Sequence, residues 1–300
     1  MMFTYGLVKI LHIQFRPPNL TELLIPFGDR SPMGLAWAYM GHSKGFGIVL
    51  GVAELLVAFL LLFRKTYILG ACVGIFVCVN IFAVNLFFDV PVKLFSGLLL
   101  LMSIFLVIPD LQRLLQFFLL NQPTQPKAFP IALQSRLAKI TRYGMLGLYI
   151  VALCFVGHMY YTYRPPAGGA ESITPLYGIY NVKHFVKEGD TIPPLTTDSV
   201  RWSQLIIQKP GSAQIKFMNG RISAVDLKVD QDKQELVLVK KEGDNSINSI
   251  LKYKIINEDL KILGKLEEID HAIDLEKYDL QKFRLINTPF RWINEYPDNK

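Results

Sequence analysis

The residue with the clearest chemical potential is Glu54, a carboxyl group in an apolar setting. It lies about halfway along the apolar run Phe46–Phe63, with glycines on the preceding turns. Ionised carboxylates are unfavourable in hydrocarbon, so Glu54 is expected to face the interior of a helical bundle, protonated or paired. Two interpretations stay open. One is a site that handles protons or binds a quinone head group; the other is a structural hydrogen bond to Asn80 or Asn85 on the next apolar run.

Further polar residues lie near the ends of the apolar runs. Lys9 follows Tyr5 and Gly6 in a short first segment, and it either reaches the membrane interface or pairs with Glu54. Asn80 and Asn85 are five residues apart and so are not stacked on one helix face; structural hydrogen bonding is the default interpretation for both.

Asp89 and Lys93 flank Val-Pro-Val, and their four-residue spacing permits an ion pair. They either brace the entry of the next helix or contact an anion or a lipid head group. Together, the candidate ligand-binding residues are Tyr5, Lys9, Glu54, Asn80, Asn85, Asp89 and Lys93, with Glu54 as the candidate catalytic residue.

Other classes of site have little support. No HxxxH, HxxE or paired Cys/His spacing is present, so no metal site is expected. The three cysteines lie inside apolar runs and are interpreted as small buried residues. Residues 165–300 contain no Ser-His-Asp array, phosphate loop or spaced carboxylate pair, and His184 and His271 are interpreted as surface residues.

The acidic residues divide the chain at about Arg164. Only five of the 25 acids fall in residues 1–164, against 13 basic residues, so this half has a net charge of +8 and the remainder −1. Scarce acids among long apolar runs indicate an integral membrane domain. The basic pI of about 9.2 reflects membrane loops, and nucleic acid is not expected as a partner.

Four runs are long enough to span a bilayer as helices, which needs roughly 20 residues. Met1–Phe15 is too short and resembles the tail end of a spanning helix, and the sequence leaves open whether the natural chain extends upstream of Met1. Residues 16–45 are predicted to be a Pro- and Gly-rich loop, and Leu111–Leu120 an amphipathic surface segment. The predicted spans are Phe46–Phe63, Tyr67–Phe88, Val92–Ile108 and Tyr143–Tyr161.

Basic residues predict the orientation of these spans. The connection 110–142 holds five basic residues against Asp110 alone, and Arg64-Lys65 lies two spans earlier, so both are expected on the cytoplasmic side. The C-terminal domain is then extracytoplasmic. In a bacterium this means a multi-pass protein of the inner (cytoplasmic) membrane, with its C-terminal domain in the periplasm or at the cell exterior.

The C-terminal part is predicted to be all-β. After a linker at 165–175, residues 176–300 contain alternating segments separated by turn residues. This pattern predicts a small antiparallel up-and-down barrel, lipocalin-like, whose edges are closed. The segments are Ala213–Met218, Ile222–Val229, Glu235–Lys240, Ile250–Ile256 and Leu260–Leu266.

Several stretches together resemble a known family. They are the runs Ser31–Ala71 and Asn85–Pro123, the Tyr5–Lys9 segment and the ending from Phe290 to Pro297; within the second run, DVPVK from Asp89 and IPDLQRLL from Ile108 are the most specific. They resemble the DoxX-like membrane proteins, in particular the longer bacterial members with an extracytoplasmic C-terminal domain. The resemblance implies a four-helix bundle and a link to quinone-dependent oxidoreductases. Phe87 and Phe88 stand where such proteins often have a cysteine, which argues against thiol chemistry.

Two functions are therefore expected. The first is a redox-associated membrane protein that holds a quinone or a similar apolar ligand near Glu54 and works with a membrane oxidoreductase. The second is a non-enzymatic membrane-anchored binding or assembly protein whose outer β domain binds a lipid or an envelope protein. Membrane lipids are expected partners in both cases.

Overall fold

The chain folds into two compact units. The computed structural model describes residues 1–125, 136–163, 174–242 and 245–288. One unit comprises Met1–Pro17 and Pro26–Arg164, and the other comprises Pro18–Ile25 and Pro165–Lys300. The linker predicted at 165–175 and the Phe290–Pro297 ending lie wholly or largely outside the described residues.

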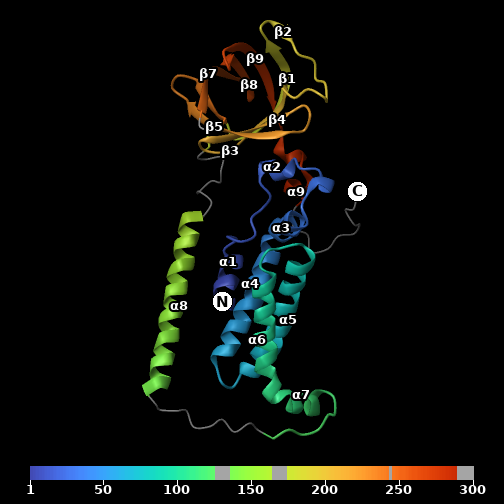
Figure 1. The fold of residues 1–300 in the computed structure, drawn as a ribbon, viewed down its shortest axis with the longest axis vertical. Helices are drawn as coiled ribbons and strands as arrows, with labels where there is room; N and C mark the ends of the chain where they lie inside the picture. Colours follow the sequence, from blue (N-terminus) through green and yellow to red (C-terminus); the bar gives the residue numbers. More distant parts are fainter. Residues whose placement is uncertain (126–135, 164–173, 243–244, 289–300) are drawn as a thin grey trace. The chain divides into compact units, whose positions relative to one another are not determined.

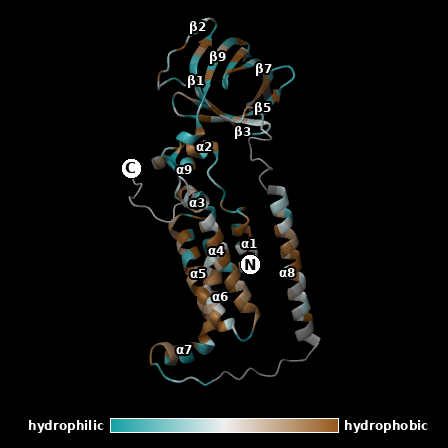
Figure 2. Cartoon of the chain, turned by 180° about the vertical axis from the view of Figure 1, so that it is seen from behind, coloured by the Kyte–Doolittle hydropathy of each residue, from teal (hydrophilic) through white to brown (hydrophobic). Residues whose placement is uncertain are grey.

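The first unit is helical and contains the membrane spans (Figure 1). Four stretches are long and apolar enough to cross a membrane: Lys44–Leu62, Tyr67–Phe87, Lys93–Phe118 and Tyr143–Thr162. Apolar residues dominate α4, α5 and α6 (Figure 2). The four predicted spans are confirmed, and the chain is a multi-pass membrane protein. The helices are α1 (Met2–Ile10), α3 (Pro32–His42), α4 (Lys44–Leu62), α5 (Tyr67–Phe87), α6 (Lys93–Val107), α7 (Leu111–Phe118) and α8 (Arg136–Tyr163), with short 3₁₀ turns η1 (Phe27–Asp29) and η2 (Ile108–Asp110).

Small residues bring α4, α5 and α6 close together. A Cβ placed on Gly74 of α5 would lie 3.3 Å from Val57 Cγ1 of α4 and 3.2 Å from Ser103 Oγ of α6. In a bilayer, helix association depends on such close packing because lipid chains are as apolar as the side chains they replace. Gly74 therefore lets α5 pack between its two neighbours.

The loop predicted for residues 16–45 is wrong over α3. Proline is tolerated in the first turn of a helix because the N–H groups there have no partner within the helix. Pro32 occupies that position, and Ser31 Oγ accepts a hydrogen bond from Gly34 N at 3.0 Å. Pro32 thus begins a helix here.

Helix α8 contacts α1 through an edge-to-face pair, Phe3 and Tyr149, with ring centroids 5.5 Å apart. Cys154 of α8 is exposed, so its interpretation as a buried residue is wrong. A pattern of apolar residues does not distinguish a lipid-facing position from a protein-facing one. Cys78 is buried as expected, 3.8 Å from Ser103 Oγ, and Cys72 is half-buried.

The second unit is built on a closed, eight-stranded antiparallel barrel. Each strand from β3 to β8 pairs with the strand that follows it. β1 pairs with both β3 and β9, which closes the barrel, and the short β2 also pairs with β1. The predicted up-and-down barrel is confirmed. Its strands are β1 (Gly178–Lys187), β2 (Asp190–Thr191), β3 (Trp202–Lys209), β4 (Ser212–Phe217), β5 (Ile222–Asp230), β6 (Glu235–Glu242), β7 (Asn245–Ile256), β8 (Asp259–Leu266) and β9 (Ile269–Lys277).

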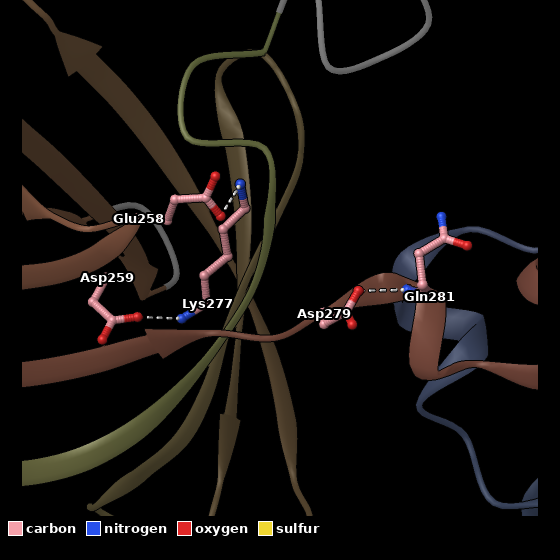
Figure 3. A network of polar contacts seen from close by, with 5 residues as sticks. All are labelled: Glu258, Asp259, Lys277, Asp279 and Gln281. Atoms are coloured by element: carbon pink, nitrogen blue, oxygen red, sulfur yellow. Dashed lines mark hydrogen bonds and ion pairs between the residues drawn. The ribbon is translucent and has the colours of Figure 1, made fainter.

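Tight turns at one barrel end set the register. Asn257 and Glu258 join β7 to β8, and both have positive φ, as a type I′ hairpin requires. Glu258 and the adjoining Asp259 both contact Lys277 at the end of β9: Lys277 N donates to Asp259 Oδ1 at 3.1 Å, and Lys277 Nζ to Glu258 Oε2 at 3.5 Å (Figure 3). The chain then continues into η4 (Leu280–Lys282) and α9 (Arg284–Asn287).

A segment from the N-terminal half packs on the outside of this barrel. The short helix α2 (Leu20–Leu23) begins with a capping box formed by Asn19 and Glu22. Leu20 is buried against Ile179 of β1 and Ile206 of β3. Thr21 accepts a hydrogen bond from Gln208 Nε2 at 3.2 Å. The β unit therefore includes residues that the sequence places in the membrane half.

Candidate functional site

The site is positioned by a crossing of α1 and α4 at two glycines. A Cβ on Gly6 would lie 2.7 Å from Gly51 O, and a Cβ on Gly51 would lie 2.5 Å from Gly6 O. Contacts this short leave no room for a side chain at either position. Lys9 and Glu54 each follow their glycine by three residues, which places them on the same helix faces one turn further on. The crossing thus brings Lys9 and Glu54 together.

Lys9 and Glu54 form a buried ion pair. Lys9 is 6% exposed and Glu54 is 1% exposed, and Lys9 Nζ donates a hydrogen bond to Glu54 Oε1. Among the described residues, Glu54 Oε2 has no hydrogen-bond partner. The structure thus pairs Lys9 with Glu54, and the hydrogen bond expected from Asn80 or Asn85 to Glu54 is replaced by this ion pair. One carboxylate oxygen remains available.

A cavity of about 270 Å³ opens beside this pair. Most of its lining is apolar and comes from α3, α4, α5 and the segment between α1 and α3. The rings of Phe15 and Trp37 have centroids 5.4 Å apart, and Lys9 Nζ lies 5.9 Å from the centroid of Phe15. The lining residues are Lys9, Gln14, Phe15, Trp37, Met40, Leu50, Ala53, Glu54, Phe76, Val77, Asn80, Ile81, Val84 and Asn85.

The polar groups of the cavity are few. Asn80 and Asn85, although not stacked on one face, both line it, and Asn85 is 6% exposed. Gln14 Oε1 is buried and, within the described part of the chain, has no partner. Buried polar atoms are normally hydrogen-bonded, so two unpartnered acceptor oxygens, from Gln14 and Glu54, mark places where a ligand can donate.

Three predicted site residues lie outside this cavity. Tyr5 is 39% exposed, and its ring centroid lies 6.0 Å from that of Phe95. Asp89 and Lys93 form an exposed ion pair at 2.5 Å, which lowers the pKa of Asp89 through the hydrogen bond and charge of Lys93. The geometry agrees with a brace at the start of α6.

Sequence reasoning missed several residues of the site. Gln14, Phe15, Trp37 and Met40 line the cavity but carry no motif. Asp110 was counted only as a loop acid, yet it is 1% exposed and accepts hydrogen bonds from Tyr67 Oη and, at 2.8 Å, from Arg113 Nη1. No spacing rule connects Tyr67 with Asp110, because they are 43 residues apart.

The part of the chain that the structure describes contains no cluster of side chains suited to binding a metal ion. No group of three or more His, Cys, Asp or Glu side chains there could hold a metal ion. His12 Nε2 instead lies 3.1 Å from Lys44 O, which joins the end of α1 to the start of α4.

Comparison with known proteins gives one informative match. No family model matches the chain, and no solved structure matches it. The chain is 32% identical over 116 residues to "Uncharacterized protein YwoB" of Bacillus subtilis (strain 168). The match covers 39% of this chain and 73% of that protein. At that identity and coverage, the chain belongs to the same protein family as YwoB.

Proposed function

We propose that this protein is a DoxX-like, redox-associated membrane protein that binds a quinone or quinol beside the Lys9–Glu54 pair. One observation carries the proposal: Glu54 lines a largely apolar cavity, and its buried Oε2 has no hydrogen-bond partner among the residues that the structure describes. Buried acids within membrane spans are rare and are associated with ion pathways, proton relays and ligand sites.

The chemistry of the cavity fits a quinol ring. Glu54 Oε2 accepts a hydrogen bond from a ring hydroxyl, and the amide groups of Asn80 and Asn85 can donate to ring oxygens or accept from them. Phe76, in the cavity lining, is 79% exposed, so this wall reaches the outer surface of the bundle. An isoprenoid tail would leave there, among the lipid chains. The apolar lining suits the ring itself.

Each residue of the pair has a distinct role in this proposal. A quinol oxidised at this site would give up two electrons to a membrane oxidoreductase partner and two protons, one to Glu54 Oε2 and the other to water. Lys9, held against Oε1, keeps the carboxylate oriented and compensates its negative charge.

The proposed location is the bacterial inner membrane, with the β domain outside the cytoplasm. Basic residues favour cytoplasmic sides for Arg64-Lys65 and the 110–142 connection. The packing of α2 supports the number of spans, because α2 packs on the barrel and must share its side of the membrane. Four spans lie between α2 and the barrel, and an even number returns the chain to the side from which it started.

The test is to extract and quantify quinones from the purified full-length protein, wild type beside Glu54→Gln. We expect a stoichiometric quinone in the wild type and its loss in Glu54→Gln. Asp89→Asn is the matched control, since it also removes one carboxylate charge but lies outside the cavity. Equal quinone content in Glu54→Gln and wild type, or phospholipid alone in every preparation, would refute the proposal.

A further inference from the structure

The barrel combines a packed core with a cavity. Tyr180, Leu260 and Leu275 belong to the buried core, each at most 4% exposed. Around Phe185 and Trp202 the side chains surround a cavity of about 370 Å³. This volume falls within the range of roughly 300–1,000 Å³ that is typical of small-molecule sites. A barrel core that served only stability would be close-packed throughout.

The inner part of this cavity is apolar. Phe185, Trp202 and Ile215 line it and are 1%, 5% and 4% exposed. The rings of Phe185 and Trp202 lie with their centroids 6.1 Å apart. Phe185 lies in β1, Trp202 in β3 and Ile215 in β4, so neighbouring strands of the barrel supply this surface. It suits a hydrocarbon chain.

Ionisable side chains form another part of the lining. Lys187, Arg221 and His271 line the cavity together with one acid, Glu267. Lys187 and Arg221 thus supply two positive charges against the one negative charge of Glu267. His271, half-buried here, is therefore not the simple surface residue that the sequence favoured. A cation excess beside an apolar chamber indicates an anionic head group joined to an apolar chain.

Arg221 is held in place before any ligand binds. Its guanidinium carbon lies 4.3 Å from the ring centroid of Phe217, a cation–π contact, and Nη2 donates a hydrogen bond to Ser199 O at 3.3 Å. An oriented guanidinium is suited to carboxylate or phosphate because it offers several donors in one plane. Lys187 has no ion pair among the described residues, so its charge is available as well.

We infer that the barrel cavity binds a single-chain amphiphile with an anionic head group, a carboxylate or a phosphate. Its chain lies against Phe185, Trp202 and Ile215, and its head group contacts Arg221 and Lys187. This site lies wholly within the β unit and is independent of the quinone proposal for the helical bundle.

The experiment measures equilibrium binding of octanoate, octyl phosphate and octanol to the full-length protein in lipid nanodiscs, with empty nanodiscs subtracted. Octanoate or octyl phosphate should bind saturably at one site and at least about tenfold more tightly than octanol. Whichever anion binds more tightly identifies the head group. Octanol binding as tight as both anions, or the absence of saturable binding above empty nanodiscs, would overturn the inference.

Two variants locate the site. Arg221→Gln should weaken binding of the anionic probe about tenfold. Lys254→Gln is the matched control, because Lys254 is exposed, is absent from the cavity lining and carries the same charge. Ser223→Phe should block the cavity without changing its charge. If the thermal unfolding curves match the wild type, unchanged affinity in both Arg221→Gln and Ser223→Phe would exclude this cavity.

Discussion

Breaking the buried pair of α1 and α4 tests whether Lys9 and Glu54 act as one unit. The single variants Lys9→Met and Glu54→Gln each leave one partner in place, and the double variant removes both charges. Lys9 is 6% exposed and Glu54 is 1% exposed, so a charge left without its partner has almost no access to water. Each single variant should therefore lower the free energy of unfolding much more than the double variant does.

The magnitude follows from that burial. Removing one member of a buried pair costs about 3–5 kcal/mol, whereas replacing both members by uncharged groups is often close to neutral. In bilayers, polar contacts between helices contribute less than this to stability, because side chains also find partners in the unfolded state within the membrane. We therefore expect about 2–3 kcal/mol for Lys9→Met and less for the double variant than for that single variant.

The assay is reversible unfolding in mixed micelles, analysed as a double-mutant cycle. Lys93→Met is the control, because the Lys93–Asp89 pair is exposed, and it should cause no measurable change. The reasoning would be refuted if the two single effects simply added in the double variant, since independent sites give additive changes in the free energy of unfolding.

Three further predictions concern packing and pH. Gly51→Ala should lower the free energy of unfolding by about 1–3 kcal/mol and reduce quinone content, because the added Cβ would lie 2.5 Å from a backbone oxygen of α1. Gly144→Ala is the control and should change neither quantity, because no atom lies within 4 Å of its Cβ. Leu20→Ala should destabilise the barrel by about 2–5 kcal/mol in thermal unfolding, since Leu20 is 3% exposed, and Leu195→Ala, at 57% exposed, should have little effect. Burial raises the pKa of Tyr180 to about 12, so the stabilisation from its neutral hydroxyl is fully present below pH 10 and is lost as the pH rises through about 12. Ultraviolet titration should show one tyrosine that ionises near pH 12 in the wild type and not in Tyr180→Phe. Identical titration curves for the two proteins would refute this pKa for Tyr180.

Local patterns were sufficient to predict most of the strands and all four spans. β4 to β8 lie where alternation predicted them, because a barrel strand must place every second side chain inside. β1, β3 and β9 were not individually located. Register shifts between Val182 and His184 in β1 and between Trp202 and Gln204 in β3 interrupt the two-residue period, which hides β1 and β3 from a pattern search.

The candidate site was predicted only in part. Glu54 is recognisable from sequence alone, because an acid within a long apolar run is unfavourable in lipid wherever it lies. Its partner is not recognisable in the same way. Lys9 is 45 residues away, and whether it snorkels to the interface or pairs with Glu54 depends on how closely α1 approaches α4.

The amino-acid sequence by itself therefore determined the division into a membrane bundle and an all-β barrel, because hydropathy and period-two alternation are properties of short segments. The tertiary structure alone decided which groups meet: Lys9 with Glu54, and α2 with the barrel wall. It also decided that the barrel holds a cavity around Phe185 and Trp202. These features depend on distances between segments far apart in the chain and on the volumes of facing side chains, which alternation leaves open.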